Sequence, residues 1–191
     1  RHLLDAGAVE QDKVAQYLYN CPAYMESMYG AWKAGLVPIN TNYRYADDEL
    51  VYLWDNADAV AVVFHGCFTE TIERIRDRVP RIVSWLWVDD GSGPCPDWAV
   101  PYETVAEAGG DRVEAPWGRS GDHLYMLYTG GTTGMPKGVM WRQDAHIRNI
   151  VAAAIDPRYG DDPGEGSIPA EEVDKPGLGG VAACPLMHGT G

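Results

Sequence analysis

Two apolar runs with a helical pattern between them constrain the fold of this chain most strongly. Val60–Phe64 is a continuous apolar run, and Ile82–Val88 is a second, largely apolar one. Such runs are typical of parallel strands that are covered on both faces. Between them, Ile72, Ile75 and Val79 recur at helical spacing. A strand, a helix and a strand in this order predict a right-handed crossover and a parallel sheet, so we expect an α/β fold.

Further helices flank these runs. Pro22 fits a helix start and Gly35 a helix end. The apolar side chains between them recur at helical spacing and predict a stripe packed in the core: Tyr24, Met25, Met28, Tyr29 and Trp32. Acidic residues fill the first turn of a second helix, which is expected to end at 56–58. Thr69 is expected to cap the helix between the apolar runs, and two more helices are expected over 102–108 and 144–155.

The segment YTGGTTGMPKGV, residues 128–139, has the composition of a phosphate-binding loop and follows an apolar run. A polyphosphate needs converging N–H and O–H donors, a backbone that approaches closely, and a positive charge. The candidate residues are the glycines, threonines and lysine of the segment: Thr129, Gly130, Gly131, Thr132, Thr133, Gly134 and Lys137. A glycine-rich turn with solvated threonines would explain the glycines. It would not explain their combination with Pro136, Lys137 and Gly138, so we favour the phosphate interpretation.

The spacing around Lys137 excludes two common phosphate loops. A Walker A loop needs a Ser or Thr directly after the lysine, but Gly138 stands there. A dinucleotide-binding fingerprint needs glycines in the order G-x-G-x-x-G, which this segment lacks.

The segment instead resembles the signature loop of the adenylate-forming enzymes, which include acyl-CoA synthetases, luciferases and peptide-synthetase adenylation domains. The family commonly has Ser where this chain has Gly131. Pro185–Gly189 resembles the family's second motif, in which an aromatic or histidine side chain lies between the carboxylate substrate and the nucleotide. The stretch from Asn20 to Tyr45 is similar to the opening of acyl-CoA synthetases in particular.

The resemblance implies a layered parallel-sheet N-terminal domain, incomplete, with the C-terminal domain absent. Members of the family are more than twice as long as this chain of 191 residues, which has no initial methionine and stops inside a motif. Residues 1–191 are therefore expected to form part of an N-terminal AMP-binding domain, and the Pro-, Gly- and acid-rich stretch 156–180 an exposed, mobile insertion.

The resemblance also implies a reaction. A carboxylic acid attacks ATP to give an acyl-adenylate and pyrophosphate, and coenzyme A then takes the acyl group. The hydroxyls and N–H groups of 129–134 are expected to hold the β- and γ-phosphates, and Lys137 to offset charge on the departing pyrophosphate. His188 is expected to line the acyl pocket, and Thr129 to present a hydroxyl to Mg²⁺. Because the later motifs of the family have no counterpart here, this chain alone is expected to make no acyl-CoA.

Two alternatives stay open at this stage. One is another adenylating ligase, such as an aryl-acid ligase. The other is a nucleotide- or acyl-binding protein that has kept the fold and lost the chemistry. Fatty acids and the side-chain acids of sterols are both plausible substrates of the preferred acyl-CoA synthetase.

Charge and cysteine content exclude several other partners. A formal net charge of −13 argues against nucleic acid. The densest basic cluster is diluted by acids and indicates a solvated helix face: Arg74, Arg76, Arg78 and Arg81. The four cysteines have neither metal nor redox spacing, and the N-terminus does not resemble a signal peptide, so a reducing cytoplasm is expected. The sequence has no apolar stretch long enough to cross a bilayer, and it is compatible with a homo-oligomer.

Overall fold

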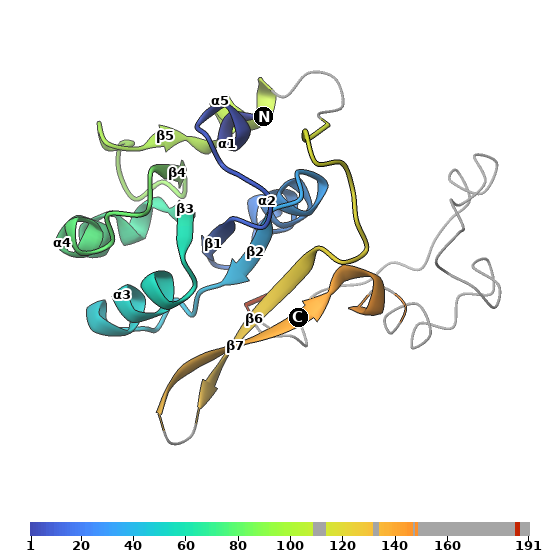
Figure 1. Cartoon of the computed structure of the whole chain (residues 1–191). Coiled ribbons are helices and arrows are strands. Elements are labelled where there is room, and N and C mark those ends of the chain that lie inside the picture. The colour runs from blue at the N-terminus through green and yellow to red at the C-terminus, as the bar shows by residue number, and fades with distance from the viewer. Residues whose placement is uncertain (109–113, 132–133, 147, 149–185, 188–191) are drawn as a thin grey trace, which may run out of the picture.

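A computed structural model describes residues 1–108, 114–131, 134–146, 148 and 186–187 of the chain. Within these ranges one mixed sheet runs through the molecule (Figure 1). Its strands, from one edge to the other, are β5 (Val100–Pro101), β4 (Ser84–Val88), β3 (Ala59–His65), β1 (Lys13–Tyr17), β2 (Val37–Asn40), β6 (Leu124–Gly131) and β7 (Gly134–Arg142). Only the β6–β7 pairing is antiparallel among the strand pairs described. The predicted α/β fold with a parallel sheet is confirmed.

Helices cover both faces of the sheet. The labelled helices are α1 (His2–Asp5), α2 (Pro22–Lys33), α3 (Asp47–Asn56), α4 (Thr69–Ile75) and α5 (Tyr102–Glu107), with short 3-10 turns η1 (Gly66–Phe68) and η2 (Arg76–Arg78). In Figure 1, α3 and α4 lie on one face, and α2 and α5 on the other. The chain crosses from β1 to β2 through α2 and from β2 to β3 through α3. These two crossovers run in opposite directions along the sheet, which places their helices on opposite faces.

Alternate strand residues supply two cores. On β3, Val62 and Phe64 belong to the core under α3 and α4, whereas Ala61 and Val63 belong to the core under α2 and α5. All four side chains are at most 1% exposed, which explains the continuous apolar run in the sequence. The helix that follows contributes Ile72 and Ile75 to the first core, as its spacing predicted.

The expected boundaries of α2 are confirmed, because Pro22 is its first residue and Gly35 follows its C-cap, Ala34. Gly35 has φ +71°, its N–H bonds the carbonyl of Trp32, and the next N–H, of Leu36, bonds the carbonyl of Ala31. This pairing closes the helix end in a left-handed turn that favours glycine. The predicted core stripe on α2 is only partly right, because Tyr29 is 46% exposed.

Of the other predicted helix boundaries, those of α3 are confirmed and the start of α4 is corrected. Acids occupy the first turn of α3, where the Glu49 carboxylate accepts a hydrogen bond from the Ala46 N–H, and α3 ends at Asn56 as expected. The prediction that Thr69 caps α4 is wrong. A 3-10 turn precedes the helix, so Phe68 takes the N-cap position and Thr69 becomes the first helical residue, without a side-chain capping bond. The helix expected over 144–155 is described only at 143–146 and 148.

The largest correction concerns the predicted phosphate loop, because most of residues 128–139 lie in strands. The strand β6 continues through Gly131, and β7 begins at Gly134, so the segment is the end of a β-hairpin with residues 132–133 outside the description. Glycine weakens a strand interior, which is why the composition indicated a loop. Pro136 is accommodated because β7 lies at the edge of the described sheet.

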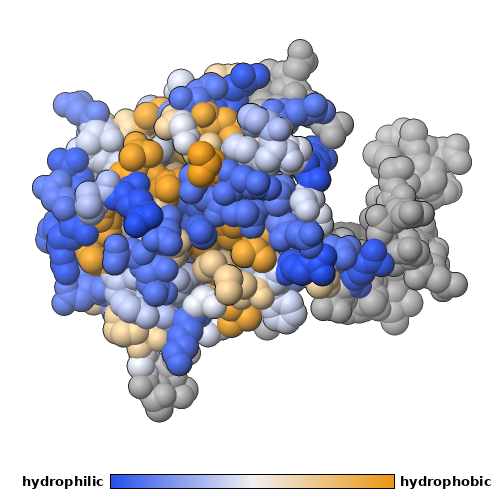
Figure 2. Space-filling view, in the orientation of Figure 1, coloured by the Kyte–Doolittle hydropathy of each residue, from blue (hydrophilic) through white to orange (hydrophobic). Residues whose placement is uncertain are grey.

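The surface over α3 and α4 is largely hydrophilic (Figure 2). Of the arginines predicted to form a solvated face, Arg74, Arg78 and Arg81 are exposed and Arg76 is half-buried. All four pair with aspartates: Arg74 with Asp47, Arg76 with Asp77, Arg78 with Asp48, and Arg81 with Asp58. None of the helices in the described ranges is long and apolar enough to span a membrane.

Gly35→Ala is expected to destabilise the fold by about 2–4 kcal/mol. A Cβ at position 35 would lie 2.2 Å from the Trp117 indole nitrogen and would force a side chain into positive φ. Gly30→Ala is the control inside α2, the helix that Gly35 ends, since a Cβ there meets nothing within 4 Å. We expect that control to be neutral or to stabilise by up to about 1 kcal/mol. Urea unfolding followed by circular dichroism measures both, and equal midpoints for the two variants would contradict the prediction.

Candidate functional site

A cavity of about 300 Å³ opens where β2 and β6 end. Its lining residues come from these two strands, the turn after β2 and one distant segment: Asn40, Asn42, Tyr45, Leu127, Tyr128, Thr129, Gly130 and Met187. The chain leaving β2 turns towards α3 and β3, and the chain leaving β6 turns the opposite way into β7. Diverging connections at the carboxyl ends of neighbouring parallel strands leave a crevice, which is where open α/β sheets bind ligands.

The Asn40 side chain connects the strands beside this cavity. Its amide nitrogen donates to the Tyr128 carbonyl at 2.9 Å and to the Met187 carbonyl at 2.6 Å. Its amide oxygen accepts from the Tyr128 N–H at 2.6 Å. Asn40 is buried, so these bonds replace the water that its amide would otherwise need. The side chain thus joins β6 to the segment that leads into His188.

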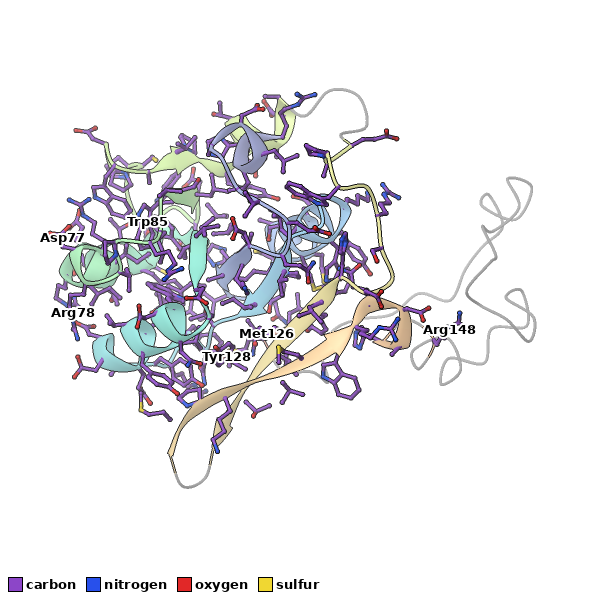
Figure 3. All side chains as sticks on the ribbon, in the orientation of Figure 1. Asp77, Arg78, Trp85, Met126, Tyr128 and Arg148 are labelled. Carbon is purple, nitrogen blue, oxygen red and sulfur yellow. The ribbon has the colours of Figure 1, made fainter. Side chains whose placement is uncertain are left out.

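Tyr128, labelled in Figure 3, is hydrogen-bonded at its side chain as well as at its main chain. Its hydroxyl donates to the Asn56 amide oxygen at the end of α3, at 2.8 Å. Burial raises the pKa of Tyr128 to about 12, so the phenol is protonated at neutral pH and remains a donor. The first residue of the predicted phosphate segment is therefore a fixed anchor.

The hairpin places Lys137 beside Thr129. These two residues are direct partners across β6 and β7, and Lys137 is exposed. The next residue of β7, Gly138, must lack a side chain. A Cβ there would lie 2.9 Å from the Met126 sulfur and 3.1 Å from the Tyr128 ring. Nearer the tip, a Cβ at Gly130 or Gly134 would meet nothing within 4 Å, so the backbone there is open to an approaching ligand.

The structure brings together part of the predicted site. Thr129 and Gly130 line the cavity, and Gly131 pairs with Gly134 towards the tip of the hairpin that carries Lys137. Thr132, Thr133 and His188 lie outside the described residues. The two residues before His188 are described, and Met187 lines the cavity with its side chain 3% exposed.

Sequence reasoning gave Asn40 no role. It follows the apolar stretch that forms β2, where a polar residue can simply mark the end of a strand. Its partners lie 88 and 147 residues further along the chain, a separation that no local pattern reveals.

The chemistry of the cavity suits a polyphosphate. None of its eight lining residues is acidic, and a hydroxyl, an ammonium and open glycine backbone stand on the adjoining hairpin. Within the described ranges, no group of three or more His, Cys, Asp or Glu side chains is arranged to hold a metal ion. The Thr129 hydroxyl is one of the oxygen donors at the cavity that could serve a bound Mg²⁺.

A sequence model of the family described as AMP-binding enzyme matches residues 1–170. The chain belongs to this family. A "Medium/long-chain-fatty-acid--CoA/3-oxocholest-4-en-26-oate--CoA ligase" of Mycobacterium marinum is 39% identical over 150 residues, which cover 75% of this chain and 27% of that protein. A "3-oxocholest-4-en-26-oate--CoA ligase" of Rhodococcus rhodochrous is 32% identical over 194 residues, which cover 98% of this chain and 34% of that protein. The chain thus spans about a third or less of the length of the curated relatives it matches.

The fold of this AMP-binding chain also matches solved enzymes. The crystal structure of the anthranilate CoA ligase AuaEII in complex with anthranoyl-AMP superposes with a TM-score of 0.69 and 21% sequence identity, over 79% of this chain and 28% of that one. The mostly parallel α/β sheet is therefore that of the adenylate-forming enzymes, as the sequence predicted.

Proposed function

We propose that the full-length protein is an acyl-CoA synthetase, which activates a carboxylic acid with ATP and transfers the acyl group to coenzyme A. The observation that carries the proposal is the hairpin of Thr129 and Lys137 at the mouth of a cavity without acidic lining. The segment before His188 reaches the same cavity through Met187. The relatives' names support an acid–thiol ligase, and the intact Lys137 argues against a lapsed binding protein.

In the proposed reaction, the residues of the chain bind and orient. The backbone of Gly130, Gly131 and Gly134 and the hydroxyls of Thr129, Thr132 and Thr133 hold the β- and γ-phosphates of ATP. Lys137 offsets the charge that develops on pyrophosphate as it leaves. Mg²⁺ supplies further charge neutralisation when bound, with the Thr129 hydroxyl beside it. His188 lines the pocket for the acyl group and the adenylate.

Residues 1–191 make up part of the N-terminal AMP-binding domain in this proposal, with 156–180 as an insertion. The chain covers 27% and 34% of two relatives, which supports the assignment to part of a longer protein. We also place the protein in the cytoplasm, since Cys21, Cys67 and Cys95 are free thiols. The preferred substrates are fatty acids and sterol side-chain acids, because the relatives' names contain both classes.

Acid-dependent exchange of pyrophosphate into ATP tests the proposal. In the full-length protein we expect exchange with medium- and long-chain fatty acids or with a steroid side-chain acid, and acyl-CoA formation when coenzyme A is added. Benzoate and anthranilate serve as the contrasting acids, and preference for them would support an aryl-acid ligase instead. Exchange with neither class, despite ATP binding, would favour the lapsed binding protein. The chain of 191 residues alone is expected to make no acyl-CoA, and turnover by it would overturn that expectation.

A further inference from the structure

The Asn40 amide uses all of its hydrogen-bonding hydrogens on two distant segments. Its NH₂ group has two hydrogens, one for the Tyr128 carbonyl and one for the Met187 carbonyl, while its oxygen takes the Tyr128 N–H. No other short side chain offers two donors and an acceptor in one plane. With the side chain 6% exposed, breaking any of these bonds would leave a buried polar group without a partner.

This side chain also explains how the cavity stays open. The β2–β6 ladder pairs only Ile39 with Met126. One residue further on, the Asn40 side chain makes both main-chain bonds to Tyr128 that a neighbouring strand would otherwise make. The Asn40 side chain takes the place that the backbone of a paired strand would occupy. β6 can therefore diverge from β2 while the N–H and C=O of Tyr128 stay hydrogen-bonded.

A second asparagine holds the adjoining peptide. Asn20, which follows β1, accepts a hydrogen bond from the Leu186 N–H at 2.6 Å. Asn20, 166 residues before Leu186, and Asn40, 147 residues before Met187, thus hydrogen-bond two successive residues from the ends of neighbouring strands. Two anchors on successive residues fix both the position and the direction of the segment that enters His188.

We propose that Asn40 is a positioning residue. It couples the hairpin formed by β6 and β7 to residues 186–187, which directly precede His188. The inference rests on the proposed function. Tyr128 and Met187 share this one amide, so phosphates held at the hairpin steady the Asn40 amide and, through it, the Met187 carbonyl. ATP bound at the hairpin therefore further stabilises the position of residues 186–187, and the carboxylate meets an α-phosphate already in register.

Hydrogen exchange of the full-length protein, with and without MgATP and in the absence of any acid, tests this coupling. In the unmodified protein we expect ATP to slow exchange in two peptides, one spanning 126–131 and one spanning 184–189. In Asn40→Ala we expect ATP to protect the first peptide and no longer the second. The matched control is Asn56→Ala, which removes the bond to the Tyr128 hydroxyl and leaves the Asn40 bonds intact. It should retain protection of both peptides.

Kinetics separate positioning from a merely structural role. Per active site, determined by titration of the adenylate burst, we expect Asn40→Ala to lower kcat for pyrophosphate exchange by about 100-fold, because small misplacements of reacting groups have effects of this size. We also expect a higher KM for the acid. Asn40→Asp should be slower still, since a carboxylate oxygen would face the two carbonyls. Unchanged kcat and KM per active site, with only a lower unfolding temperature, would overturn the proposal.

The outcomes distinguish this inference from the proposed function. If ATP protects both peptides of the unmodified protein and only the first in Asn40→Ala, but no acid supports exchange of pyrophosphate, acid activation fails while the coupling through Asn40 stands. If acid activation occurs and Asn40→Ala keeps ATP-dependent protection of 184–189, the coupling fails alone. If ATP protects neither peptide of the unmodified protein, both proposals are wrong.

Discussion

Lys137→Ala in the full-length protein is expected to slow acyl-adenylate formation by about 100- to 1,000-fold, the usual effect of removing one preorganised group that stabilises transition-state charge. Lys137 is exposed and stands opposite Thr129 on the hairpin, so its ammonium extends from a fixed strand position without a burial cost. Because charge on pyrophosphate grows as its bond to the α-phosphate breaks, we expect kcat to fall more than the KM for ATP rises.

Arg142→Ala is the control for this experiment. Arg142 lies at the other end of β7, where it pairs with Asp122 at the surface. Its removal takes the same charge from the same strand, and exposed ion pairs contribute about 1 kcal/mol or less to stability. We expect near-normal pyrophosphate exchange from Arg142→Ala. If both variants lose activity equally, or if neither loses activity, Lys137 has no specific role.

The sequence predicted the parallel part of the sheet because its signals are local. The uninterrupted apolar run Val60–Phe64 indicates by itself a strand that is buried on both faces. Pro22 and Gly35 indicate helix ends because their own backbone angles favour these positions. Thr69 failed as a cap because a 3-10 turn moved the helix start by one residue, a detail that tertiary packing decides.

The hairpin and the Asn40 contacts could not be predicted in the same way. β7 contains two glycines and a proline, which oppose strand structure locally, and it exists because the β6 ladder pairs with it from Leu124 to Gly131. The residues of the phosphate segment were identified from composition, but their placement in paired strands depends on that ladder. Asn40 depends on partners from two other parts of the chain, so its geometry becomes visible only in the folded structure.

Trp54→Ala is expected to cost about 3–5 kcal/mol of stability, as truncation of a large buried aromatic side chain does. Trp54 is 1% exposed on α3, and its ring makes edge contacts with Tyr17 and Trp85. Its indole N–H donates to the Thr41 hydroxyl at 3.1 Å. Truncation therefore creates a cavity in the core and also removes the partner of a fully buried hydroxyl.

The same contact links this core to the site. Thr41 directly follows Asn40, and its own N–H bonds the Gln16 carbonyl of β1. Trp54→Phe keeps a six-membered aromatic ring and loses the rest of the indole, including its N–H, so we expect about 2–3 kcal/mol of destabilisation from one unpaired buried polar group and a small cavity. Trp141→Ala makes the same truncation as Trp54→Ala at a position that is 41% exposed on β7. Its effect should stay below about 1 kcal/mol.

Urea unfolding of the three variants, followed by circular dichroism, gives the comparison. We expect the order Trp54→Ala, Trp54→Phe, Trp141→Ala from the largest loss to the smallest. If the two truncations cost the same, the packing of α3 on the sheet is not what stabilises this core. If Trp54→Phe is as stable as the unmodified protein, the bond to Thr41 contributes nothing. In that case the end of β2 beside the cavity is held by its main-chain bond to β1 and by the Asn40 amide alone.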